Sequence, residues 1–146
     1  MALTKDLVVD AGATFDWGFN YVRSEEVGGE IVPGDPYDLT GCDARMQVRR
    51  KITDATALLT LTTENEGIVI DGPEGRIDIL ITDLQTSALY PDGTPGKKLD
   101  CVYDLELVWP LVPPATRRKV TRLLEGKLSA DPGVTRDNDA DGEDDE

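Results

Sequence analysis

The sequence contains no histidine and only two cysteines, Cys42 and Cys101. Without histidine, the chain lacks the commonest general base, the usual partner of a nucleophilic serine and the commonest ligand of transition metals. The two cysteines form no Cys-x-x-Cys motif, and two thiols are too few for a disulfide framework. We therefore interpret both as small apolar residues within strands, and we predict a protein that is not an enzyme and binds no cofactor.

Long apolar runs are also missing from the sequence. No segment approaches the roughly 18 to 20 consecutive apolar residues that a membrane-spanning helix needs. Residues 1–10 include Lys5 and Asp6 where a secretory signal peptide has its apolar region. We expect a protein that is made in the cytoplasm, stays in solution and has no membrane partner.

Positive charge is scarce, because 15 Lys and Arg residues face 29 Asp and Glu residues, for a formal net charge of −14. This balance argues against a nucleic-acid partner, which clustered basic residues would bind. Residues 137–146 contain seven of the acids and no basic residue. We predict a folded domain over residues 1–136 and a disordered acidic tail over residues 137–146, since the tail has nothing to bury.

The sequence does contain a clear alternation of apolar and polar residues. Phe15, Trp17 and Phe19, for example, alternate with small or polar residues. A period of two is typical of strands with one buried and one solvated face, which antiparallel sheets favour. The strand-like segments are residues 6–9, 13–22, 42–49, 58–62, 67–71, 76–81, 99–109 and 119–128. We predict an all-β fold, an antiparallel, immunoglobulin-like β-sandwich of about eight strands, in which Trp17 and Trp109 belong to the core.

One segment has a helical pattern, and two have the composition of loops. Thr82 is a candidate N-cap and Gln85 follows three residues later, so residues 82–89 are predicted to form a short connecting helix with a capping box. Residues 25–37 contain Gly-Gly, Pro-Gly and Asp-Pro pairs, and residues 110–115 contain three prolines. We expect contacts with partner subunits at residues 25–37, 90–97 and 110–118.

Several short motifs follow one another along most of the chain. They are YDLTG at residues 37–41, ARMQVR at 44–49, LLTLTT at 58–63, ENEG at 64–67, GRI at 75–77, YDLEL at 103–107, TRLLEG at 121–126 and VTR at 134–136. In their order and spacing, these motifs resemble tailed-phage β-sandwich virion proteins of the tail-fibre collar and baseplate. The resemblance extends over about residues 5–136. The acidic tail and the proline-rich segment 110–115 depart from the family pattern.

The resemblance implies a structural role in the virion. The chain would be an assembly or adaptor subunit of the tail tip or tail-fibre collar, in a homo-oligomeric ring that contacts other phage structural proteins. The family offers no catalytic residue to transfer. Three alternatives stay open: a head decoration or head–tail connector protein, a glycan-acting hydrolytic domain that uses a pair of carboxylates, and a calcium-dependent binding module.

One candidate metal site lies in the acidic tail. Asp137, Asp139 and Asp141, followed by Gly142, match the first half of a calcium-binding loop. The chain ends at Glu146, two residues before the position that needs a bidentate acid. We therefore interpret these residues as part of a solvated tail that binds cations weakly at most.

Two basic clusters supply the candidate partner contacts. Arg49 and Arg50 belong to the first cluster, and Arg117 and Arg118 belong to the second. Their default role is that of solvated strand and loop positions. Their functional role would be to bind an acidic surface of a partner subunit, with a strength that falls as salt increases.

Overall fold

The computed structural model describes residues 2–90 and 98–132. This part of the chain contains eleven β-strands and one short α-helix, so the prediction of an all-β fold is confirmed. In chain order the elements are β1 (Leu3–Thr4), β2 (Leu7–Asp10), β3 (Phe15–Asn20), β4 (Val22–Val27), β5 (Glu30–Pro36), β6 (Asp43–Arg49), β7 (Leu59–Thr62), β8 (Ile68–Asp71), β9 (Arg76–Ile81), α1 (Asp83–Ala88), β10 (Leu99–Val108) and β11 (Val120–Asp131). Each of the eight predicted segments contains a strand, and β1, β4 and β5 are additional.

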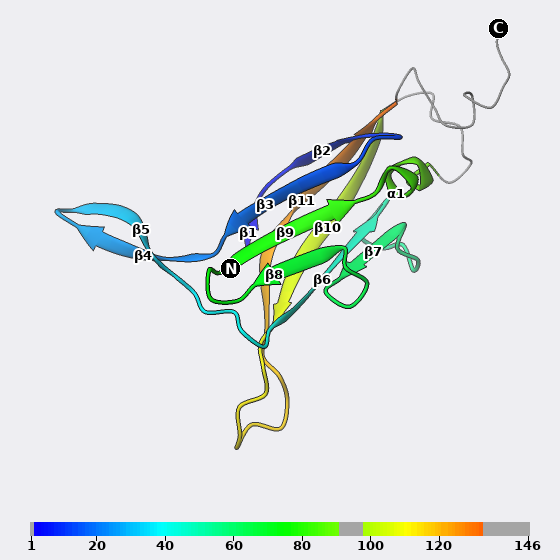
Figure 1. The fold of residues 1–146 in the computed structure, drawn as a ribbon. Coiled ribbons are helices and arrows are strands. Elements are labelled where there is room, and N and C mark those ends of the chain that lie inside the picture. Colours follow the sequence, from blue (N-terminus) through cyan, green and yellow to red (C-terminus); the bar gives the residue numbers. More distant parts are fainter. Residues whose placement is uncertain (1, 91–97, 133–146) are drawn as a thin grey trace, which may run out of the picture.

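The strands form two open sheets and a separate hairpin (Figure 1). The larger sheet has six strands in the order β1–β11–β10–β6–β7, and β2 also pairs with β11. The smaller sheet has the order β3–β9–β8, and it lies in front of the larger sheet in Figure 1. The remaining two strands, β4 and β5, pair only with each other among the described residues.

The direction of pairing is mixed, which corrects the prediction of a purely antiparallel fold. β6, β7, β10 and β11 are antiparallel neighbours, whereas β1 and β2 run parallel to β11. In β2, Leu7 and Val9 are buried and Val8 is exposed, which is the alternation expected of a strand with one buried face. Alternation depends only on which side of a strand is buried, so it is the same for parallel and antiparallel neighbours.

One hydrophobic core joins the two sheets. Leu105 of β10 and Ile79 of β9 are completely buried in it, and Cys101 is buried beside them as a free thiol. Trp17 and Trp109, which were predicted to belong to the core, are half-buried and pack against it, so they lie at its edge rather than in its centre. Burial of alternate apolar residues from both sheets is the main source of the stability of such a fold.

Residues 25–37 were predicted to be a loop, and this prediction is wrong. Most of these residues belong to the hairpin β4–β5, which turns at Gly28 and Gly29 with φ angles of 61° and 87°. A two-residue turn with both φ angles positive matches the right-handed twist of a hairpin, and Gly-Gly is one of the pairs that favour it. The strands escaped detection because neither face of the hairpin packs on the core, so the sequence has no alternation there.

Helix α1 begins where the capping box predicts. The Thr82 hydroxyl accepts a hydrogen bond from the Gln85 backbone N–H, and the Gln85 side chain accepts one from the Thr82 backbone N–H. The fully buried Thr86 hydroxyl accepts from Gly12 N–H and donates to the Ala13 carbonyl. These bonds attach the helix to the turn between β2 and β3.

Candidate functional site

The outer face of the six-stranded sheet, which is the side turned away from the core, carries charged side chains in cross-strand rows. In one row, Glu106 of β10 lies between Arg45 of β6 and Arg122 of β11. In the next row, Asp104 of β10 is directly opposite Glu125 of β11. Arg45 Nε is 2.8 Å from Glu106 Oε1, so opposite charges meet where the register brings them together.

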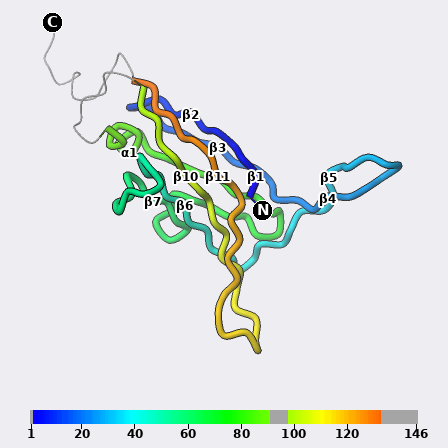
Figure 2. Tube along the Cα trace, turned by 180° about the vertical axis from the view of Figure 1, so that it is seen from behind, coloured from blue at the N-terminus to red at the C-terminus, as the bar shows by residue number. Residues whose placement is uncertain are grey.

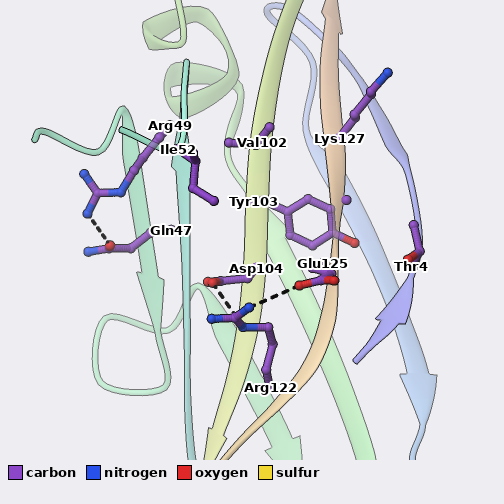
Figure 3. Close-up of a pocket in the computed structure, with 11 residues that line it drawn as sticks. Thr4, Gln47, Arg49, Ile52, Val102, Tyr103, Asp104, Arg122, Glu125 and Lys127 are labelled. Atoms are coloured by element: carbon purple, nitrogen blue, oxygen red, sulfur yellow. Dashed lines mark hydrogen bonds and ion pairs between the residues drawn. The ribbon is translucent and has the colours of Figure 1, made fainter. Parts of the chain in front are cut away.

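A shallow pocket of about 510 Å³ lies on this face, between β6, β10 and β11 (Figure 3). In it, Arg122 Nε is 3.5 Å from Asp104 Oδ2, and Arg122 Nη1 is 3.2 Å from Glu125 Oε1. Partial burial raises the pKa of the Asp104 carboxyl, the Glu106 carboxylate adds to the rise, and Arg122 opposes it. One guanidinium therefore holds two carboxylates in a single ion-pair network.

Two of the predicted contact arginines, Arg49 and Arg50, lie at the C-terminal end of β6, next to the pocket. Arg49 lines the pocket and donates hydrogen bonds to the Asp54 carbonyl and to Gln47 Oε1, both at 2.8 Å. Arg50 is exposed on the turn that follows β6 and makes no hydrogen bond or ion pair within the described part of the chain. Of this pair, Arg50 alone has a guanidinium without a hydrogen bond or ion pair to a described residue.

The loop between β10 and β11, residues 109–119, projects from one end of the two sheets (Figures 1 and 2). We call it the basic loop, because Arg117, Arg118 and Lys119 follow one another in it and it contains no acidic residue. Leu111 and Val112 are also on its surface, with 48% and 67% of their area exposed. The basic loop thus combines positive charge with exposed apolar side chains.

Arg118 closes the base of the basic loop. It donates hydrogen bonds to the carbonyl oxygens of Trp109, Gly41 and Val108 at 2.7, 3.2 and 3.3 Å, and its Nη1 is 2.9 Å from Asp43 Oδ2. This side chain is therefore used within its own chain, where it positions the loop. Arg117, which was predicted as a partner contact together with Arg118, does not share these bonds.

Arg117 is exposed and unpaired. Within residues 2–90 and 98–132, it makes no hydrogen bond, ion pair or ring contact. It lies on the basic loop beside Arg118, whose several bonds hold the loop backbone in place. Arg117 is therefore a positive charge without a described partner, on a loop whose backbone is held in place by Arg118.

The hairpin β4–β5, residues 22–36, projects in a different direction from the basic loop (Figures 1 and 2). We call it the acidic hairpin, because it contains four acids and one base. The acids are Glu25, Glu26, Glu30 and Asp35, and none of them forms an ion pair within the described residues. At its tip, Val27 and Ile31 are 58% and 71% exposed.

A cluster of aromatic rings joins the roots of the two projections. Tyr21 and Tyr37, which flank the acidic hairpin, stack with ring centroids 4.4 Å apart, and Tyr37 meets Trp109 of the basic loop edge-on at 6.3 Å. The Arg23 guanidinium lies 4.5 Å from the Tyr37 ring centre, and Lys119 Nζ lies 5.7 Å from that of Trp109. The cluster anchors both projections at one end of the core.

The candidate calcium residues Asp137, Asp139 and Asp141 lie outside the described residues, as do residues 91–97 of a predicted contact region. In the part of the chain that the structure describes, no group of three or more acidic or cysteine side chains is placed to hold a metal ion. Across the same residues, no helix has the length and hydropathy that a bilayer crossing requires.

Sequence reasoning did not identify Asp104 and Glu125 as a pair. The two residues are adjacent only because of the pairing register, and that register shifts at a bulge between Leu105 and Glu106. The bulge places both Leu123 and Leu124 among the buried residues, so strict alternation fails there. Two neighbouring leucines in an otherwise alternating strand are the one signal that could have indicated the shift.

No protein-family model matches this chain, and no curated protein matches it. The surfaces must therefore be interpreted from their own chemistry. The outer-face carboxylates and arginines largely neutralise one another, whereas the acidic hairpin and Arg117 of the basic loop keep unpaired charge beside exposed apolar side chains. Such mixed surfaces are suited to binding other macromolecules.

Proposed function

We propose that this chain is a structural protein of a tailed-phage virion, an assembly or adaptor subunit of the tail tip or tail-fibre collar. In this proposal its two sheets form an immunoglobulin-like β-sandwich that is a rigid, non-catalytic block. Its partners are copies of itself and other phage structural proteins, and it resides in the virion after synthesis in the host cytoplasm. The support comes from the ordered motifs of residues 37–126 and from the two projections of the domain.

The observation that carries the proposal is the acidic hairpin. No residue of β4 or β5 belongs to the hydrophobic core, and most of their side chains are exposed. An isolated two-stranded hairpin is at best marginally stable in water. A projecting hairpin with exposed Val27 and Ile31 is therefore expected to gain its stabilisation from a partner surface.

The proposal treats the pocket of the outer face as a structural surface. A glycan-acting site needs one carboxyl to donate a proton and a second to act as base or nucleophile. Here both candidate carboxylates, Asp104 and Glu125, are already engaged by the Arg122 guanidinium in one ion-pair network. This shared pairing supports the non-catalytic alternative over the hydrolytic one.

The test is to locate the protein in particles of the phage whose genome encodes it. We expect its peptides in the mass spectrum of gradient-purified particles, and immunogold label at the tail tip. Pre-immune serum on the same particles is the control. Label on the capsid would support the head decoration alternative, and a particle free of these peptides would refute a virion role.

A further inference from the structure

The acidic hairpin has charge that the described part of its own chain leaves unmatched. Glu25, Glu26, Glu30 and Asp35 form no ion pair within the described residues, and the single basic residue, Arg23, lies over the Tyr37 ring at the root. The turn of the hairpin is surrounded by open space, because a side chain added at Gly28 or Gly29 would meet no atom within 4 Å. The tip is therefore open to a binding partner.

The basic loop has the complementary surface. It presents three consecutive bases without an acid, and Arg117 among them has no partner in the described part of the chain. Leu111 and Val112 supply exposed apolar area on the loop, as Val27 and Ile31 do on the hairpin. Charge of opposite sign next to apolar area on both surfaces is the pattern of two sides of one interface.

The two surfaces do not meet within one chain. The hairpin and the basic loop leave the aromatic cluster of Tyr21, Tyr37 and Trp109 in different directions (Figures 1 and 2). The two surfaces can therefore match each other's charge only when they belong to different molecules. Because they are different patches, a contact between them joins copies head to tail, which closes into a ring or continues as a filament according to the rotation.

We propose that the acidic hairpin of one copy docks on the basic loop of the next copy of this chain. In this contact, Arg117 faces the carboxylates of the hairpin, and Val27 and Ile31 pack against Leu111 and Val112. Arg118 acts indirectly, since it holds the loop in the conformation that presents Arg117. The inference rests on the proposed function, because it names the surfaces through which the assembly subunit would join its own copies.

The experiment measures self-association of the full chain by sedimentation velocity over a concentration series. We expect oligomers at low salt whose dissociation constant rises as NaCl increases to about 0.5 M, because exposed charges are screened over that range. Arg117→Glu and, separately, Glu26→Lys with Glu30→Lys should each weaken association by about tenfold or more. Circular dichroism of each variant checks that it is folded.

A charge exchange between the two surfaces gives the sharpest result. An equimolar mixture of the Arg117→Glu protein and the Glu26→Lys, Glu30→Lys protein should regain association, because the reversed hairpin of one variant matches the reversed loop of the other. Lys127→Glu is the matched control, since it reverses an exposed basic residue of β11 outside both surfaces and outside both basic clusters, and it should associate like the wild type.

Three results would overturn the inference: a wild-type chain that stays monomeric at every concentration, an effect of Lys127→Glu equal to that of Arg117→Glu, or a mixture that fails to recover. Each of these outcomes leaves the virion role to be judged by the particle experiment. Absence of the chain from particles would refute the proposed function even if the purified protein self-associates through these surfaces.

Discussion

At the scale of single residues, neighbouring arginines of the basic loop have different roles. Arg118 makes hydrogen bonds to three backbone carbonyls and to Asp43, whereas Arg117 has no partner among the residues that the structure describes. A guanidinium has five donors in a fixed plane, so one arginine can satisfy several carbonyls that meet at the base of a loop. The sequence places both residues in one basic cluster and does not distinguish them.

Replacing Arg118 by Ala is expected to destabilise the fold, because several carbonyls at the loop base lose a charged donor. We expect a loss of about 1 to 2 kcal/mol in the free energy of unfolding, reduced by the partial exposure of the side chain. Urea denaturation followed by tryptophan fluorescence measures it. Arg117→Ala is the control and should change stability by less than about 0.5 kcal/mol; equal losses for the two variants would contradict the assignment.

Ionisation of the Tyr103 hydroxyl is expected to lower the free energy of unfolding at high pH. Its hydroxyl donates a hydrogen bond to the Lys5 carbonyl at 2.6 Å, and burial, with a contribution from Asp6, raises the pKa of Tyr103 from 10.0 to about 12. A group whose pKa is raised in the folded state stabilises the fold below its unfolded pKa, and this stabilisation is lost as the pH rises through the folded pKa. The window is therefore about pH 10 to 12.

The measurement compares wild type with Tyr103→Phe by urea denaturation from pH 8 to 12. The variant should be less stable below pH 10, because the Lys5 carbonyl loses its donor, and its disadvantage should shrink by about 2 kcal/mol toward pH 12. Tyr21, whose pKa burial also raises, is present in both proteins and cancels in the comparison. Parallel pH profiles for the two proteins would show that the Tyr103 hydroxyl is not responsible.

At the scale of elements, the acidic hairpin depends on how its root is attached. The Tyr21 N–H donates to the Gly75 carbonyl at 2.7 Å, and the Tyr37 N–H donates to the Tyr21 carbonyl at 2.9 Å. Gly75 has a φ of 63°, and a Cβ added there would lie 2.7 Å from the Tyr37 carbonyl oxygen. Only glycine fits this crossing of three backbone segments without strain.

Gly75→Ala should therefore lower the free energy of unfolding by about 2 to 3 kcal/mol, from the positive φ together with the clash. Gly29→Ala is the matched control, since its φ of 87° is also positive but the space around it is open. We expect the control to lose about 1 kcal/mol. Chemical denaturation of both variants decides the matter, and a control that loses as much as Gly75→Ala would rule out the role of crowding at the root.

At the scale of the whole molecule, two sheets share one core. Buried residues of the six-stranded sheet, such as Leu105, and of the three-stranded sheet, such as Ile79, belong to one cluster. Neither sheet can keep its apolar face buried without the other. A small domain with a single core unfolds in one cooperative transition.

The two tryptophans allow this cooperativity to be tested. Trp17 lies on β3 of the smaller sheet, and Trp109 lies next to β10 of the larger one. The variants Trp109→Phe and Trp17→Phe each keep one fluorescent reporter, on opposite sheets. Within each variant, the fluorescence transition in urea should coincide with the loss of circular dichroism. A sheet whose reporter responds at a lower urea concentration than the circular dichroism signal would indicate two separate folding units.

Much of the fold could be predicted from the sequence, because burial of one face leaves an alternating pattern. All eight predicted strand segments contain strands, and the capping box of Thr82 and Gln85 is formed as predicted. The acidic hairpin was missed as secondary structure, since strands without a buried face have no such pattern. The sequence indicated that arginines would be the candidate partner contacts. It did not show which of them bond within the chain and which do not.

In most strands that pack on the core, the sequence by itself determined which side chains face it, because that choice depends on the polarity of successive residues. Only the tertiary structure decided that β1 and β2 run parallel to β11 and that Asp104 and Glu125 share Arg122. It also decided that Arg118 is engaged while Arg117 has no partner in the described part of the chain. These outcomes depend on which strands become neighbours and in what register. Strands pair through backbone N–H and C=O groups, which are nearly the same in every residue, so the sequence does not show which strands pair or in what register.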